Sequence, residues 1–246
     1  MAESYKIIAE QDYCTVVAKY ESSRKNGNAY QSEQDLERWL IEQLQRQGYE
    51  YPSIHNEKEL LENLRIQLGK ANDTEYSDKE WTSLLNILTS ETLTMEDKAD
   101  MIQKENTAVE IERDNGIKTN VHLIHKDNVF KNNLQVINQY VPAGGTHANR
   151  YDVTILVNGL PLVHIELKRR GVSIREAFNQ INRYARESFW AGKGMFDYIQ
   201  LFIISNGTET KYYSNTTRYA REQEADKQKG KKKKIQSNSF EFTSYW

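Results

Sequence analysis

Apolar residues recur at helical spacing through the first half of the chain, and residues 28–105 are therefore predicted to be mostly helical. In the stretch YQSEQDLERWLIEQLQRQGYEY, four apolar side chains fall on one helical face: Leu36, Trp39, Leu40 and Leu44. Ser32 is placed to cap this helix, with Asp35 at its third residue. Three further helices are predicted: residues 56–70, a helix that opens with the capping box Ser77 and Glu80, and a short helix from Thr94 to about residue 104.

The second half of the chain changes to strand-forming patterns, which predict a sheet core over residues 106–217. The strands are expected at 107–113, 121–125, 134–141, on both sides of Asn158-Gly159, in the run DYIQLFIISNGT, and at 210–214. DYIQLFIISNGT is nearly continuous in apolar residues, as expected of a central strand that is covered on both faces. A helix that opens with the capping box Ser173 and Glu176 precedes it. The order of elements predicts an α/β (α+β) fold, with a mixed central sheet flanked by helices.

We expect residues 1–246 to form a single domain that includes a lysine-rich segment over 219–236. Its central part, REQEADKQKGKKKK at 221–234, has two interpretations. The composition is typical of a solvated, mobile surface loop. The same lysines would also suit a loop that contacts phosphates or a partner. Nothing in the local sequence separates the two.

Composition and charge narrow the class of protein. There are 33 Lys and Arg against 35 Asp and Glu, so the formal net charge is −2. A stand-alone DNA-binding protein usually has a basic surplus, so any nucleic acid must be held by a local basic cluster or by another domain. The chain shows neither a secretory signal nor a run of roughly 18 apolar residues that would span a membrane. With a single cysteine, Cys14, these features predict a cytoplasmic location.

The segment RYDVTILVNGLPLVHIELKRR, residues 150–170, carries the candidate chemistry. Side chains alternate along a strand, so His164, Glu166 and Lys168 share one face. Asp152, on the preceding strand, joins them only in one register. A two-residue turn at Asn158-Gly159 pairs 151 with 166 and directs Asp152 to the wrong face, whereas one extra residue pairs 152 with 166. We therefore predict a bulged or longer turn, or a distortion at Asp152 itself.

In that register, Asp152 and Glu166 form a carboxylate pair that favours a bound cation. Oxygen ligands in a small cluster favour Mg²⁺, which takes one or two carboxylates and keeps waters for a substrate phosphate. Lys168 lies within reach to orient an attacking water or to stabilise the developing charge. This combination suits phosphodiester hydrolysis. On spacing alone the pattern has little specificity, because an ordinary edge strand can carry the same charges.

Three helical residues have two interpretations each. Gln180 and Tyr184 are four residues apart and share a helical face. In an ordinary helix Tyr184 would pack in the core and Gln180 would face solvent, whereas in a functional site both would line the cleft. Glu37, in the first predicted helix, would be either a solvated helix charge or a group that reaches the metal through a water.

Several separated motifs resemble the N-terminal nuclease region of the R (HsdR) subunit of type I restriction enzymes. They are YQSEQDLERWLIEQLQRQGYEY, DKEWTSLL, RYDVTILVNGLPLVHIELK, EAFNQINRY and LFIISNGT, which occur in order between about residues 28 and 217. The resemblance implies a PD-(D/E)xK core of the RecB-like kind. In that family Asp152, Glu166 and Lys168 would be the catalytic triple, with Asp152 and Glu166 holding the metal.

Within the resemblance, Gln180 and Tyr184 match the family's Gln-xxx-Tyr motif as supporting, DNA-binding residues, and we add Glu37 to this group. One departure is Tyr151, which stands where the motif's name has a proline. No phosphate-binding Gly-x4-Gly-Lys-Ser/Thr loop occurs in the chain, so the sequence resembles a fragment of a longer subunit that also has motor domains.

The resemblance implies an endonuclease that cuts double-stranded DNA and uses Mg²⁺, with Mn²⁺ as an alternative. ATP would act only through the helicase domains of the full-length subunit. The implied partners are those helicase domains and the methyltransferase and specificity subunits of the restriction-modification complex. Two alternatives remain open: a catalytically silent nuclease fold used for docking, and another PD-(D/E)xK nuclease of DNA repair or junction resolution. The second would require a basic, usually dimeric surface, which the charge balance does not favour.

Overall fold

The computed structural model describes residues 4–9, 17–21, 32–105, 107–142, 150–184, 194–216 and 243–245. The chain divides into two compact units, Met1–Gln31 and Ser32–Trp246. The first unit contains an antiparallel pair, β1 (Ser4–Ala9) and β2 (Val17–Glu21). The single domain expected over residues 1–246 stays a prediction, and both Cys14 and the lysine-rich segment lie outside the described residues.

The second unit is built around a mixed sheet with the strand order β10-β9-β8-β7-β6-β5. Its strands are β5 (Leu134–Tyr140), β6 (Tyr151–Val157), β7 (Leu160–Leu167), β8 (Leu201–Ser205), β9 (Thr210–Ser214) and β10 (Ser244–Tyr245). The β7–β8 pair is parallel and the other pairs are antiparallel. Helix α5 (Ile174–Tyr184) and the short helix η3 (Met195–Tyr198) lie in the connection from β7 to β8. This mixed sheet with flanking helices confirms the predicted α/β class.

The four helices before the sheet begin where the sequence predicts. They are α1 (Glu33–Arg46), α2 (Glu57–Ala71), α3 (Asp78–Leu88) and α4 (Met95–Gln103). Ser32, Ser77 and Thr94 each accept a hydrogen bond from the backbone N–H three residues later, and the acidic side chain at that position bonds back to the cap. Each capping box satisfies donors that the first helical turn would otherwise leave unpaired.

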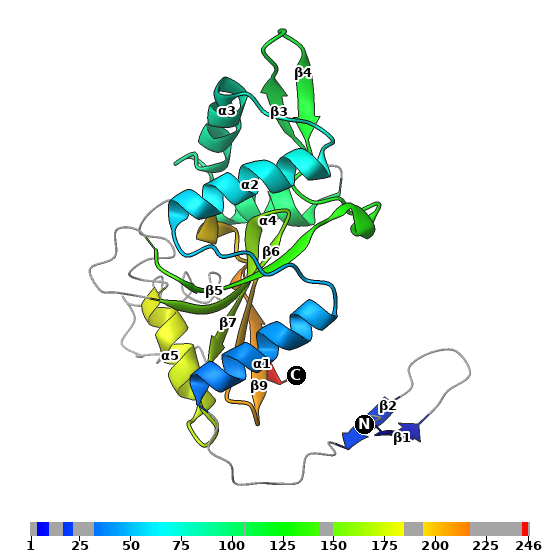
Figure 1. Ribbon diagram of the computed structural model, residues 1–246, viewed down its shortest axis with the longest axis vertical. Coiled ribbons are helices and arrows are strands. Elements are labelled where there is room, and N and C mark those ends of the chain that lie inside the picture. Colours follow the sequence, from blue (N-terminus) through cyan, green and yellow to red (C-terminus); the bar gives the residue numbers. More distant parts are fainter. Residues whose placement is uncertain are drawn as a thin grey trace, which may run out of the picture. The chain divides into compact units, whose positions relative to one another are not determined.

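Two apolar clusters cover the sheet. The smaller one packs Leu36 and Ile41 of α1 on Val136, Val153 and Ile165 of the sheet. The larger cluster contains residues of α2, α3, α4 and α5 together with the β6–β7 hairpin. Figure 1 shows α1 and α5 next to β7, with α2 farther along the sheet.

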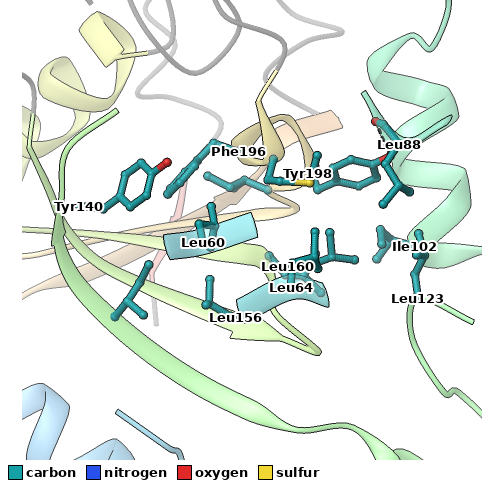
Figure 2. Close-up of a cluster of buried hydrophobic side chains, with 14 of the residues drawn as sticks. Leu60, Leu64, Leu88, Ile102, Leu123, Tyr140, Leu156, Leu160, Phe196 and Tyr198 are labelled. Atoms are coloured by element: carbon teal, nitrogen blue, oxygen red, sulfur yellow. Dashed lines mark hydrogen bonds between the residues drawn. The ribbon is translucent and has the colours of Figure 1, made fainter. Parts of the chain in front are cut away.

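In the larger cluster, helix α2 packs on the turn of the hairpin. Figure 2 shows Leu60 and Leu64 of α2 close to Leu156 and Leu160, which lie on the two strands of the hairpin. In the same cluster the hydroxyl of Tyr198 donates a hydrogen bond of 3.0 Å to the carbonyl of Leu88, the last residue of α3. The hairpin that carries the candidate chemistry is therefore anchored at its turn, away from the charged groups.

One predicted strand is wrong in position. Strands β3 (Val109–Glu112) and β4 (Lys118–Val121) form a small antiparallel sheet, so β4 ends where the expected strand 121–125 begins. After β4, backbone N–H groups bond to asparagine side chains and not to a neighbouring strand. Asn72 accepts from the His122 N–H, and Asn132 accepts from the His125 N–H. The chain then turns through η1 (Val129–Lys131) into β5.

The β6–β7 hairpin has the predicted register but reaches it in another way. The turn at Asn158-Gly159 is a tight two-residue turn that pairs Val157 with Leu160, and both central residues have positive φ, 52° and 82°. The expectation of a longer turn is therefore wrong. The register shifts within the strands instead, because Ile155 pairs with Val163 while Leu156 pairs with Pro161, and one residue of β7 is left over as a bulge.

The bulge lies beside Pro161, which has no N–H to give to the ladder, and bulges are one of the few places where a sheet tolerates proline. Beyond the bulge Val153 pairs with Ile165, so Asp152 comes opposite Glu166. The tight turn is held in place by Asn158, whose side-chain amide donates to the carbonyl of Leu123 and to Asn132.

Among the described residues, no helix combines the length and the apolar character that crossing a membrane would require.

Replacing Gly159 with alanine should destabilise the fold by about 3 kcal/mol, the sum of left-handed backbone strain and overpacking. An added Cβ would lie 2.7 Å from the Cα of Leu64, a backbone atom that cannot yield easily. Gly116 is the matched control, because its φ is +79° but a Cβ there meets nothing within 4 Å. Urea unfolding should show that Gly116→Ala lowers the free energy of unfolding by only about 1–2 kcal/mol. Equal losses in the two variants would contradict the close packing of α2 on the turn.

Candidate active site

The carboxyl groups of Asp152 and Glu166 converge where β6 begins and β7 ends. One oxygen of Asp152, Oδ2, accepts a hydrogen bond of 2.9 Å from the backbone N–H of Leu167. This contact fixes the Asp152 side chain beside the residue that follows Glu166. A side-chain hydrogen bond also joins Asp152 and Glu166.

The alternation of side chains between the two faces of β6 is broken at Asp152. This is the distortion that the sequence analysis gave as one possibility. Tyr151 packs in the larger apolar cluster and Val153 in the smaller one, although two residues so spaced ordinarily share a face. On the neighbouring strand, Gln139 lies between the pairs Asn138–Val153 and Tyr140–Tyr151 and has a positive φ of 55°. Both strands are therefore distorted at the same level, and Asp152 lies at that level.

Glu166 is fully buried and has a different partner at each oxygen. Its Oε1 lies 3.5 Å from the amine Nζ of Lys168, and its Oε2 lies 3.3 Å from the imidazole Nε2 of His164. Burial raises the pKa of Glu166 to about 8, although the positive charge of Lys168 opposes the shift. Burial, and then the charge of Glu166, raise the pKa of Asp152 to about 7. Both groups are therefore carboxylates that are costly to ionise without more positive charge nearby.

Lys168 is held between the sheet and helix α1. Its Nζ lies 3.8 Å from Oε2 of Glu33 as well as 3.5 Å from Glu166, and its backbone N–H donates to the carbonyl of Ser205. The other oxygen of Glu33 accepts from the backbone N–H of Arg169 at 3.3 Å. The sequence analysis missed Glu33, because an acidic residue in the first turn of a helix is common for reasons of the helix dipole alone.

Glu37 is buried, so its interpretation as a solvated helix charge is wrong. Both of its oxygens accept hydrogen bonds from amide side chains of β5, one from Asn138 and one from Gln139. Burial raises the pKa of Glu37, and the nearby charge of Asp152 adds to the shift. The positive φ of Gln139 brings two neighbouring side chains of β5 to one carboxylate, which no sequence pattern indicates. A water-mediated contact of Glu37 with a metal stays a prediction.

Gln180 and Tyr184 both lie on α5, whose residues Ala177 and Phe178 pack in the larger cluster. Gln180 is half-buried, and the side chain of Tyr184 lies outside the described residues. Their supporting roles stay predictions.

The carboxylate pair fits a small divalent cation. Within the described ranges, no three His, Cys, Asp or Glu side chains group to hold a metal by themselves. Mg²⁺ needs no such cage, because it binds proteins through one or two carboxylates and fills its other positions with water and substrate oxygens. Two adjacent buried carboxylates with raised pKa values match that requirement.

A mixed sheet whose strand ends bring together two carboxylates and a lysine is consistent with a nuclease-like α/β core. The family model described as "Type I restriction enzyme R protein N terminus" matches residues 30–221. The chain belongs to this family, which confirms the resemblance seen in its motifs.

The chain is also similar to proteins named as type I restriction enzyme endonuclease subunits. The chain is 45% identical over 248 residues to the type I restriction enzyme EcoprrI endonuclease subunit of Escherichia coli, covering 100% of this chain and 74% of that protein. It is 41% identical over 192 residues to the SauMSSORF170P endonuclease subunit of Staphylococcus aureus (strain MSSA476), covering 76% of this chain and 20% of that protein. It is also 33% identical over 123 residues to the putative MjaVIIIP endonuclease subunit of Methanocaldococcus jannaschii, covering 48% and 12%. The chain thus spans a fifth or less of these last two relatives.

Replacing Glu166 with glutamine should stabilise the metal-free chain at pH 8. The folded-state pKa values of Asp152 and Glu166, about 7 and 8, lie above the ordinary values of 3.8 and 4.5. As pH rises above about 4, the unfolded chain releases these protons first, so stability falls until both groups are ionised in the folded chain as well. Glu166→Gln removes one of the two contributions, worth on the order of 4 kcal/mol at pH 8 and little at pH 4. Urea unfolding without metal at both pH values measures this. A variant less stable than the parent at pH 8 would contradict the proposed cost of the buried charge.

Proposed function

We propose that this chain is the Mg²⁺-dependent DNA endonuclease part of a type I restriction enzyme R subunit, with Mn²⁺ able to replace Mg²⁺. The observation that carries the proposal is the convergence of Asp152 and Glu166 beside Lys168 in a chain of this family. The printed names of the relatives, which are endonuclease subunits, support the same activity.

In this proposal Asp152 and Glu166 hold the metal. Bound Mg²⁺ lowers the pKa of a coordinated water and offsets negative charge on the scissile phosphate. Asp152 and Glu166 would each offer one carboxylate oxygen to the metal, since Leu167 engages only Oδ2 of Asp152 and His164 only Oε2 of Glu166, while Oε1 of Glu166 lies 3.5 Å from Lys168. A bound cation would lower the raised pKa values of both carboxyl groups and so keep them ionised near neutral pH.

Lys168 is the third member of the proposed catalytic set. Its ammonium group is held at the site by Glu166 and Glu33, so it is positioned before a substrate arrives. There it donates a hydrogen bond to the attacking water or to a phosphate oxygen, where negative charge develops. Gln180, Tyr184 and Glu37 support the DNA and the metal-bound water around this centre.

The wider system belongs to the same proposal. Since the chain covers only 20% of its S. aureus relative, we place it in a longer subunit whose helicase domains translocate double-stranded DNA with ATP. Methyltransferase and specificity subunits would complete the complex, in the cytoplasm. These domains and partners would supply the grip on DNA that a net charge of −2 does not favour.

Single substitutions in the complete subunit test the proposal. Asp152→Asn, Glu166→Gln and Lys168→Ala should each lower the rate of DNA cleavage by at least about 100-fold, because each removes a group that stabilises the transition state. ATP hydrolysis should be unchanged, since these groups do not belong to the helicase domains.

Glu62→Gln is the control, because Glu62 is a solvent-exposed carboxylate that pairs only loosely with Lys58 on α2. It should cleave DNA at the parent rate. Cleavage retained in all three site variants would overturn the assignment, and a chain that also fails to bind Mn²⁺ would be the docking module instead.

A further inference from the structure

His164 is a fully buried histidine that the proposed chemistry does not yet use. It lies on β7 two residues before Glu166, and neither side chain is exposed to solvent. Its ring meets Tyr151 edge-on, with centroids 5.4 Å apart, and Phe202 at 6.3 Å. Burial in this setting lowers the pKa of His164 although the charge of Asp152 opposes the shift, so the imidazole is neutral.

The two ring nitrogens of His164 have different neighbours. Nε2 lies 3.3 Å from Oε2 of Glu166, and Nδ1 lies 3.4 Å from the hydroxyl Oγ1 of Thr154. When Glu166 holds a metal it is an ionised carboxylate, which only accepts hydrogen bonds, so the nitrogen that faces it must carry the proton. A neutral imidazole has a single N–H, and Nδ1 is then an acceptor, which the Thr154 hydroxyl satisfies as donor. The Thr154 hydroxyl, which can donate or accept, is therefore compatible with the tautomer that an ionised Glu166 requires.

We propose that His164 is a positioning residue that orients the Glu166 carboxylate for the metal. The Nε2–H of His164 holds Oε2, so the carboxyl group cannot rotate and its Oε1 remains directed toward Lys168. This inference rests on the proposed function, since it concerns the metal ligand of that site. The arrangement parallels the backbone N–H of Leu167, which holds one oxygen of Asp152. Each carboxyl group thus has one oxygen held by a donor of the protein, and the second oxygen of Glu166 lies 3.5 Å from the amine of Lys168.

Hydrogen bonds to a metal ligand from the surrounding shell typically change metal affinity by 10- to 100-fold. Glutamine and methionine form a matched pair of replacements, because their side chains have the same length and only glutamine ends in a donor. Methionine is also well tolerated in apolar interiors, so the comparison isolates the donor.

Mn²⁺ binding to the full-length chain, followed by calorimetry or by the electron paramagnetic resonance of free Mn²⁺, is the test. His164→Gln should bind within about threefold of the parent, whereas His164→Met should bind about 10- to 100-fold more weakly. Thermal unfolding of both variants checks that each is folded. A folded His164→Met with the parent's affinity would overturn the inference while leaving the proposed function intact. The parent chain should bind Mn²⁺, and replacing Asp152 should abolish that binding. If either fails, the proposed function is overturned, and this inference with it.

A second measurement needs no variant to fold. The imidazole ¹⁵N spectrum of the unmodified chain at saturating Mg²⁺ should show His164 protonated at Nε2 and unprotonated at Nδ1. A ring protonated at Nδ1 alone would place an acceptor against the Glu166 carboxylate and would overturn the inference.

Discussion

The register between β6 and β7 is the constraint on which the candidate site depends. Side chains alternate across a sheet, so a slip of one residue would move Asp152 away from Glu166. A tight turn at Asn158-Gly159 would by itself produce that wrong register. The bulge next to Pro161 restores the correct one, and the distortion at Asp152 and Gln139 then brings the carboxylate to the N–H of Leu167. The packing of α2 on the turn holds the hairpin at its far end, where no charged group of the site is involved.

The site concentrates charge that the fold would be more stable without. Asp152, Glu166 and Glu37 are all carboxyl groups whose pKa burial raises, and Lys168 lies within ion-pair distance of only one of these three. Two apolar clusters on the sheet offset this cost, and the small network of Glu33, Lys168 and Glu166 distributes part of it. Such local destabilisation is common where a protein is arranged for a ligand that brings the missing charge. His164 contributes without adding charge, because its neutral ring can fix a carboxylate in an apolar setting.

Much of the fold was predictable because its signals are local. Ser32, Ser77 and Thr94 mark helix starts through bonds within one turn, and the even spacing of His164 and Glu166 places both on one face of a strand. The register that brings Asp152 opposite Glu166 was also predictable, but the position of the extra residue that produces it was not. An extra residue in the turn and an extra residue in the strand give the same pairing. The Asn-Gly dipeptide and the side-chain bonds of Asn158, made with residues 26 and 35 positions away, favour the tight turn. The burial of Glu37 was not predictable for a similar reason. Its partners Asn138 and Gln139 lie on a strand about a hundred residues later, and one of them reaches it through a left-handed backbone.

The central claim is that Asp152 and Glu166 share one divalent cation. Anomalous X-ray scattering from crystals of the chain soaked in Mn²⁺ measures this directly. We expect a peak within bonding distance, roughly 2.2 Å, of one carboxylate oxygen of each residue, with Lys168 beside it. A peak that contacts neither carboxylate, or none at a Mn²⁺ concentration on the order of 10 mM in crystals with an accessible site, would contradict it.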